Sequence, residues 1–130
     1  DESERKTQNQ AMTEISNDGL IIDIGRKKFK PALIQRILTE KDEIIFDQST
    51  VLSEVLAEKG CGGLTNDLGK AKALLNTWGS KEPMILKAQD VQNGSDIILS
   101  EDDAVAVFKN NRKNNFLEQA KVVFVVQNRE

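Results

Sequence analysis

The clearest chemical feature of this sequence is a short basic segment built around one aromatic residue. Arg26, Lys27, Lys28 and Lys30 flank Phe29, so four of five consecutive residues are cationic. Such a cluster can neutralise several phosphates, and a nucleic-acid base can stack on the phenylalanine ring. The segment therefore predicts a nucleic-acid contact. The alternative interpretation is a solvated loop whose Phe29 packs at the start of the next helix.

A second group of polar residues lies on a predicted helix from Asn66 to Trp78. An apolar stripe at helical spacing runs through this segment and is expected to face the core. Asn66, Lys70 and Lys72 lie outside that stripe. Because amide and ammonium groups can bind base edges or phosphates, we expect these three residues to contact nucleic acid as well.

Catalytic chemistry has little support in the composition. The chain has no His and a single cysteine, Cys61, so it lacks the commonest general base and metal ligand and cannot form an internal disulfide or a Cys-based zinc site. No serine is paired with a Lys, Asp or Glu base at a recognisable spacing. We predict that the protein is not an enzyme and that it uses neither a metal ion nor a cofactor.

Two segments approach catalytic motifs but lack the necessary side chains. In the glycine-rich stretch 62–71, Ala71 stands where a phosphate-binding P-loop needs Ser or Thr. Asp47 and Lys87 would suit a metal-dependent nuclease core, but Ile85 occupies the position of its second acid, and a hard cation requires oxygen ligands. A nuclease-like fold without a complete metal site is therefore only a second alternative, based on element order.

Hydrophobic periodicity and capping residues predict an alternation of strands and helices. The run KVVFVV near the C-terminus is rich in β-branched residues and is expected to be a central strand, buried on both faces. We expect strands at Leu20–Ile24, Glu43–Phe46, Met84–Ala88, Ser95–Leu99 and Lys121–Val126, and helices beginning at Pro31, at Ser49 or Thr50, at Thr65 or Asn66, and at Ser100.

The predicted order over residues 31–99 is helix, short strand, helix, turn, helix and hairpin, with Asn93-Gly94 at the hairpin tip. This order resembles that of winged-helix domains, which are a variant of the helix-turn-helix. The resemblance implies that the helix from Asn66 to Trp78 enters the major groove and that Gln92–Ser95 forms the wing. The expected fold is a mixed α/β (α+β) domain with about four helices and one sheet of four or five strands.

Length and charge limit the organisation and the partners. The 130 residues suit one domain, with residues 1–17 as a polar tail and residues 18–130 as the folded unit. The net charge is -3, so only local basic patches could bind a polyanion. No apolar run approaches the roughly 20 residues that span a bilayer, and no signal peptide is recognisable. We expect no membrane partner and an intracellular location, either cytoplasmic or nuclear/nucleoid.

Two classes of function fit these features. The first is a non-catalytic binding module that contacts DNA or RNA through the basic segment and the helix that begins at Asn66. The alternative is a protein-interaction or assembly domain of a larger polypeptide, which the acidic net charge and the absence of a catalytic set favour. In that case an exposed sheet edge would be the natural docking surface.

Overall fold

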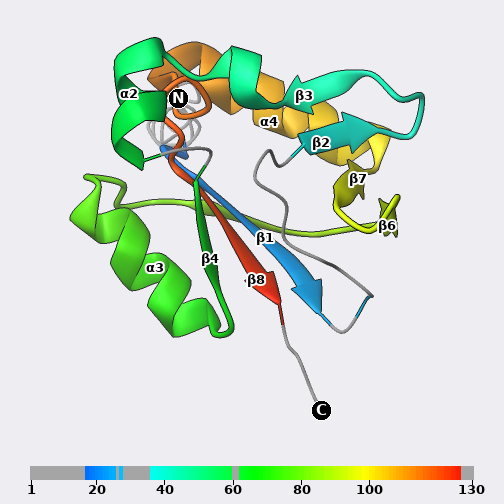
Figure 1. Ribbon diagram of the computed structural model, residues 1–130, viewed down its shortest axis with the longest axis horizontal. Helices are drawn as coiled ribbons and strands as arrows, with labels where there is room; N and C mark the ends of the chain where they lie inside the picture. The colour runs from blue at the N-terminus through cyan, green and yellow to red at the C-terminus, as the bar shows by residue number, and fades with distance from the viewer. Residues whose placement is uncertain (1–16, 26, 28–35, 60–61, 127–130) are drawn as a thin grey trace, which may run out of the picture.

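In the part of the chain that the structure describes, two four-stranded sheets and three helices build a single small α+β domain (Figure 1). The computed structural model describes residues 17–25, 27, 36–59 and 62–126. The first sheet, called the parallel sheet here, has the order β4-β8-β1-β5 and contains only parallel pairs. Its strands are β1 (Leu20–Gly25), β4 (Gly63–Thr65), β5 (Met84–Lys87) and β8 (Val122–Val126).

The second sheet, called the mixed sheet, has the order β3-β2-β7-β6. Its two central strands are parallel, and each outer strand is antiparallel to its neighbour. The strands are β2 (Arg36–Thr39), β3 (Ile44–Phe46), β6 (Asp90–Gln92) and β7 (Asp96–Leu99). The chain thus builds two sheets of four strands where the sequence predicted one sheet of four or five.

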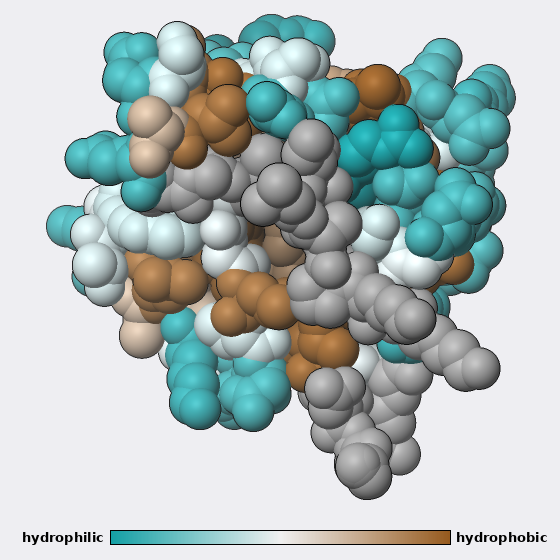
Figure 2. All heavy atoms as spheres, viewed as in Figure 1, coloured by the Kyte–Doolittle hydropathy of each residue, from teal (hydrophilic) through white to brown (hydrophobic). Residues whose placement is uncertain are grey.

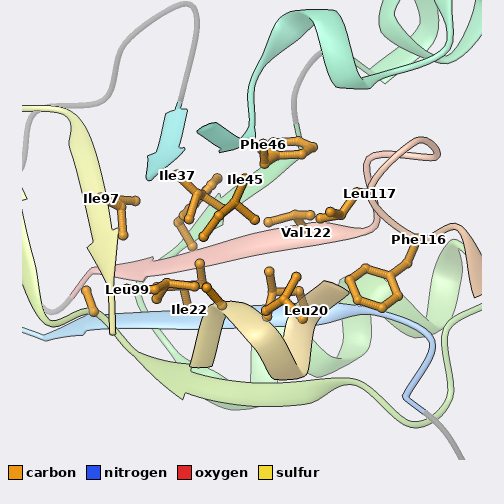
Figure 3. Packing of buried hydrophobic residues seen from close by; sticks show 14 of the residues in the cluster. Leu20, Ile22, Ile37, Ile45, Phe46, Ile97, Leu99, Phe116, Leu117 and Val122 are labelled. Carbon is orange, nitrogen blue, oxygen red and sulfur yellow. The ribbon is translucent and has the colours of Figure 1, made fainter. Parts of the chain in front are cut away.

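Alternation along β1 and β8 divides the core into two parts, because successive side chains of a strand point to opposite faces. Leu20, Ile22 and Val122 face the mixed sheet and join its Ile37, Ile97 and Leu99 in the main core (Figure 3). On the other face, Ile21, Val123 and Val125 pack with Ala71 and Leu75 of α3 (Leu68–Thr77). Strand β8 lies between β4 and β1 with both faces buried, which confirms the predicted central strand.

The remaining helices are α2 (Ser53–Lys59) and α4 (Glu101–Asn114), with a short 3-10 turn, η1 (Gln48–Thr50), before α2. Ser100 caps α4 as predicted, because its side chain accepts a hydrogen bond from the Asp103 backbone N–H at 3.2 Å. An asparagine-rich stretch, residues 110–115, forms the last turn of this helix. The helix continues to Asn114 and ends at Asn115, which adopts the left-handed conformation with φ 51° and ψ 37°.

The asparagines of α4 hold the chain that enters β1. The Asn110 side chain accepts a hydrogen bond from the backbone N–H of Asn17 at 2.9 Å. One helical turn later, the Asn114 side chain donates to the backbone carbonyl of Asn17 at 2.7 Å. Asn111 accepts from the Leu117 N–H at 2.9 Å and so orders the turn beyond the helix. The stretch is therefore part of the framework.

The described residues do not confirm the predicted winged-helix order. Residues 36–39 form strand β2 where the helix beginning at Pro31 was expected to continue, while residues 31–35 lie outside the described part. The apolar pair Ile37 and Leu38 fits one helical face, but it equally fits a strand buried on both faces, and pairing with β7 decides for the strand. In addition, β4 separates α2 from α3, so these helices are not joined by a simple turn.

Candidate functional site

One edge of the parallel sheet collects polar side chains from three strands. The register aligns Thr65 with Val125, Val125 with Asp23, and Asp23 with Lys87. Partners in a parallel register share a face, so Thr65, Asp23 and Lys87 form one row with Val125 on the side of the sheet where α3 packs. Two residues earlier along the strands, the corresponding residues are Gly63, Val123, Ile21 and Ile85. The sheet therefore changes from apolar to polar at its last row.

The predicted basic segment begins at this same edge. Strand β1 ends at Gly25, level with Val126 of β8, and the basic residues follow Gly25 directly in sequence. Lys27 is exposed, and its backbone N–H donates to the Ile24 carbonyl at 3.4 Å. The other cations of the segment, Arg26, Lys28 and Lys30, lie outside the described residues.

The start of α3 lies at the end of β4 and so at the same edge. The N-cap of the helix is Asp67, where the sequence predicted Thr65 or Asn66, and its carboxylate accepts from the Lys70 N–H at 3.0 Å. The Thr65 hydroxyl donates to the Asp67 carbonyl at 3.1 Å. Lys70 Nζ lies 3.5 Å from Asn66 Oδ1, so the structure brings these two predicted site residues together on the surface.

The strand order sets the distance between the two predicted groups. Only β8 separates β1 from β4, and neighbouring strands are about 4.8 Å apart, so the two strand ends lie roughly 10 Å from each other. Lys72 does not join this group. Residues two apart in a helix are separated by about 200° around its axis, so Lys72 projects from another side of α3 than Lys70.

Sequence reasoning missed Asp23, Thr65 and Lys87 as members of the edge. A signal for two of them is present, because Asp23 follows the apolar run Leu20–Ile22 and Lys87 follows Met84–Leu86. The strand alignment that makes them neighbours is not visible in the sequence. We call the group formed by Asp23, Lys27, Thr65, Asn66, Asp67, Lys70 and Lys87 the carboxyl edge.

Both carboxylates of the carboxyl edge accept backbone hydrogen bonds. Asp23 Oδ1 accepts from the Gly25 N–H at 2.9 Å, and Asp67 is the helix cap already described. These acids thus have a local structural role at the points where the chain turns. Three exposed lysines, Lys27, Lys70 and Lys87, project from the same edge. Its chemistry suits the binding of an anion across several strand ends.

The predicted wing lies in the other sheet. The hairpin with Asn93-Gly94 at its tip joins β6 to β7 of the mixed sheet, and not β5 to β7 as expected. Asn93 and Gly94 have positive φ values of 53° and 81°, which these two residues tolerate best. Because α3 packs on the parallel sheet, the wing and the expected recognition helix belong to different layers.

Asp47 and Lys87, the residues considered for a nuclease-like metal site, also lie at different sheets. Asp47 follows β3 in the mixed sheet and caps η1, accepting from the Ser49 N–H at 2.9 Å. Lys87 ends β5 in the parallel sheet. Among the described residues, no three Cys, Asp or Glu side chains are grouped so that they could hold a metal ion.

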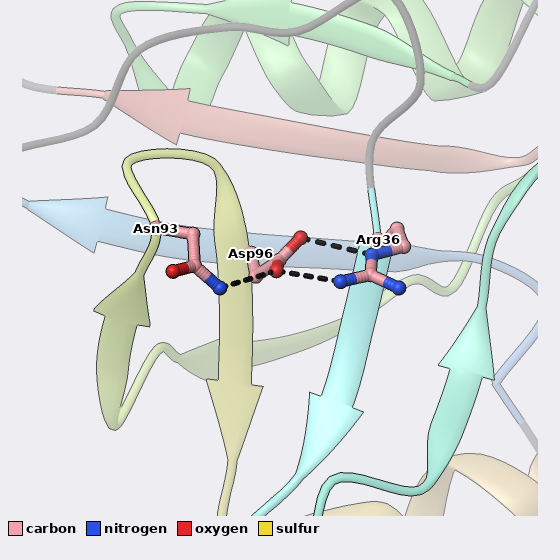
Figure 4. A network of polar contacts seen from close by, with 3 residues as sticks. All are labelled: Arg36, Asn93 and Asp96. Carbon is pink, nitrogen blue, oxygen red and sulfur yellow. Dashed lines mark hydrogen bonds and ion pairs between the residues drawn. The ribbon is translucent and has the colours of Figure 1, made fainter.

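An ion pair in the mixed sheet involves the most buried carboxylate of the described chain. Arg36 donates to Asp96 through Nε at 3.0 Å and through Nη2 at 2.7 Å, and the Asn93 amide donates to Asp96 at 3.2 Å (Figure 4). The hydrogen bond from Arg36 holds the pKa of Asp96 below its ordinary value, against the opposing effect of burial. The same bond raises the pKa of Arg36. This network joins β2 to β7 and stabilises the register in which the two strands pair.

Comparison with known proteins identifies a family. No helix in the described ranges is long and apolar enough to cross a membrane. None of the curated proteins matches the chain. A family model described as the second domain of Treponema pallidum Tp0624 matches residues 19–128, which includes every strand and helix described above. By this match the chain belongs to the family of the second domain of Treponema pallidum Tp0624.

Proposed function

We propose that this chain is a non-catalytic module that binds nucleic acid through the carboxyl edge of its parallel sheet. The observation that carries the proposal is the strand order β4-β8-β1, because Lys27 follows β1 and the Asn66–Lys70 group follows β4 at the same edge of the sheet. Ligands of open parallel sheets bind beyond the carboxyl ends of the strands. The proposal implies an intracellular location, because nucleic acid is found inside cells.

Charge and spacing support phosphate as the group that is bound. Lys87 ends β5, Lys27 follows β1, and Lys70 lies in the first turn of α3, which follows β4. The sequence adds Arg26, Lys28 and Lys30 after β1. The ends of β1 and β4 lie roughly 10 Å apart, because one strand separates them. Lysines spread over that distance can contact more than one phosphate.

The proposed mode of binding differs from that of a winged helix. Only the start of α3 reaches the carboxyl edge, through Lys70 in its first turn and Asn66 just before its N-cap. Beyond its first turn, the exposed residues of the helix are Lys72, Ala73, Asn76 and Thr77, which include one cation. We therefore assign the contact to the strand ends and the helix start, with Lys72 as a peripheral residue.

The test measures binding of a labelled DNA duplex and a labelled single-stranded RNA by fluorescence anisotropy at low salt. Lys70→Glu, Lys87→Glu and the double variant Lys27→Glu, Lys28→Glu are each expected to weaken binding about tenfold. The salt dependence of DNA binding should also become shallower, by about 0.9 in slope for each phosphate that the variant no longer neutralises. Circular dichroism verifies that each variant is folded.

A matched control is available near the same strand. Lys81 precedes β5 at the opposite end of the parallel sheet, whereas Lys87 is the last residue of β5, so Lys81→Glu changes the net charge equally but leaves the carboxyl edge intact. Binding is expected to survive Lys81→Glu. The proposal fails if neither nucleic acid binds, or if Lys81→Glu weakens binding as much as Lys87→Glu.

A second candidate function rests on the family match. In the Treponema protein the matching unit is described as a second domain, so it is one part of a larger polypeptide. By this relationship the present chain would serve as an assembly domain of a longer protein. Limited proteolysis of the full-length gene product tests this: a protected fragment that starts near residue 17 and ends near residue 128 is expected, and cleavage within β1 to β8 would contradict it.

A further inference from the structure

Helix α4 exposes two large apolar side chains next to each other. Val105 is 56% exposed and Phe108 is 42% exposed, and residues three apart are neighbours on a helix surface. Ala104 and Val107 of the same helix are buried in the main core. Hydrophobic residues also reach the surface among hydrophilic ones on the face seen in Figure 2.

Charges of opposite sign continue this apolar pair in both directions. Asp102 stands three residues before Val105, and Arg112 stands four residues after Phe108; both are exposed or partly exposed. At 100° per residue, all four side chains fall within about 120° of the helix circumference. The same arc also holds Glu101 beside Asp102 and the exposed Lys109 between Phe108 and Arg112 along the helix. The side chains thus form a stripe that is acidic at one end, apolar in the middle and basic at the other end, which we call the α4 stripe.

We propose that the α4 stripe binds the α4 stripe of a second copy of this chain, with the two helices antiparallel about a twofold axis. A symmetric contact of this kind requires a surface that is complementary to itself. In the antiparallel arrangement Val105 lies opposite Phe108 of the partner, and Asp102 lies opposite Arg112 of the partner. In an antiparallel helix pair, residues that face each other have residue numbers with a constant sum. The two pairs give sums of 213 and 214, so one twofold axis places both pairs opposite each other.

Charge complementarity favours a second copy over an unrelated partner. Both signs are on one helix, so one antiparallel copy satisfies both ends of the stripe, whereas a parallel copy would place acid against acid and base against base. The helix has 14 residues and is about 21 Å long. One helix pair of this length buries less than the roughly 1,200 Å² of a stable complex, so the dimer is expected to be weak.

The acid and the base also have a reason to be where they are within one molecule, because acids at the start of a helix and bases at its end stabilise it. An experiment must therefore separate this effect from association. Asp102→Lys places two positive charges opposite each other in a homodimer, and Arg112→Glu places two negative charges opposite each other. A mixture of the two variants brings opposite charges together again in the heterodimer, while the effect on each helix is unchanged.

Sedimentation equilibrium over a wide range of concentration measures the dimer. Wild type is expected to dimerise weakly, each charge variant alone to remain monomeric, and their mixture to dimerise again. Phe108→Ser is expected to weaken the dimer about tenfold or more. The matched control is Ile85→Ser, which removes an apolar side chain that is 45% exposed on β5 and should leave the dimer unchanged.

Three results would overturn the proposal. They are a wild-type chain that is monomeric at the highest concentration reached, a mixture of Asp102→Lys and Arg112→Glu that stays monomeric, and a dimer that Ile85→Ser weakens as much as Phe108→Ser does. Circular dichroism of each variant verifies the helix content. Because the α4 stripe shares no residue with the carboxyl edge, nucleic-acid binding and dimerisation can fail independently.

Discussion

Arg36 and Asp96 are direct partners in the register of β2 and β7, and their side chains make a two-point ion pair. Arg36 is partly exposed, while Asp96 is buried. A shift of one residue in this pairing would turn every side chain of β2 to the other face of the mixed sheet. The ion pair stands at the first step of the ladder and selects the observed register.

The first prediction concerns the pH dependence of folding. Hydrogen bonding by Arg36 gives Asp96 a lower pKa in the folded chain than in the unfolded chain. Its stabilising contribution is therefore complete above the unfolded pKa of about 3.9 and is lost as the pH falls through the folded pKa. Urea unfolding between neutral and strongly acidic pH measures the effect. Asp96→Asn should lower the free energy of unfolding at neutral pH by about 1–3 kcal/mol. The variant should also lose less stability than the wild type when the pH is lowered.

Asp18 is expected to account for a further part of the acid sensitivity. Burial acts to raise the pKa of Asp18, but the N–H groups of Lys81 and Glu82 and the Ser80 hydroxyl hold it lower. The sign is the same as for Asp96, so this contribution is also lost on acidification. The variant carrying both Asp18→Asn and Asp96→Asn should show a flatter acid limb than either single variant. An unchanged limb would contradict this assignment.

Two adjacent glycines should respond differently to substitution. At Gly62, with φ +97°, an added Cβ would lie 2.3 Å from the Val122 carbonyl oxygen. This oxygen belongs to the backbone, which can move away only at a high energetic cost. At Gly63 it would lie 2.6 Å from the end of the Leu74 side chain, which can move. Gly62→Ala is expected to destabilise more than Gly63→Ala in thermal unfolding. Leu74→Ala should offset part of the cost at Gly63 and none at Gly62.

The end of α4 offers a test of backbone conformation. Asn115 has φ 51°, a region that asparagine and glycine tolerate and β-branched residues do not. Asn115→Val should destabilise by about 1–2 kcal/mol, whereas Asn115→Gly should be close to neutral. Chemical denaturation of the two variants measures the difference, and equal stabilities would show that this C-cap does not require a positive φ.

The cap of α3 connects stability with the proposed function. Asp67→Asn retains a good N-cap acceptor and removes a negative charge from the carboxyl edge. Thermal stability should change little, while binding of the DNA duplex should become several-fold tighter at low salt. Asp90→Asn, in the mixed sheet, makes the same change of charge elsewhere and serves as the control. Equal effects of the two substitutions would argue against the carboxyl edge.

Several elements follow from local sequence alone. The apolar residues of Leu20–Ile24 and the uninterrupted apolar run Val122–Val126 predict β1 and β8, and helical periodicity predicts α3. Ser100 and the acids after it predict the start of α4. These signals act within a few residues along the chain, through strand propensity, capping and the dipole of the first helical turn. They need no knowledge of distant partners.

Other elements depend on contacts between residues that are distant in sequence. Strand β2 exists because it pairs with β7, 60 residues further on, with Arg36 opposite Asp96. The three residues of β4 carry no strand pattern and are held between β8 and the side chains of α3. The sequence could name Lys27 and Lys70 as cations of the candidate site, but it did not indicate Lys87. Only the parallel order β4-β8-β1 decides that Lys27 and Lys70 meet at one edge, because adjacency in a sheet depends on long-range pairing and not on local propensity.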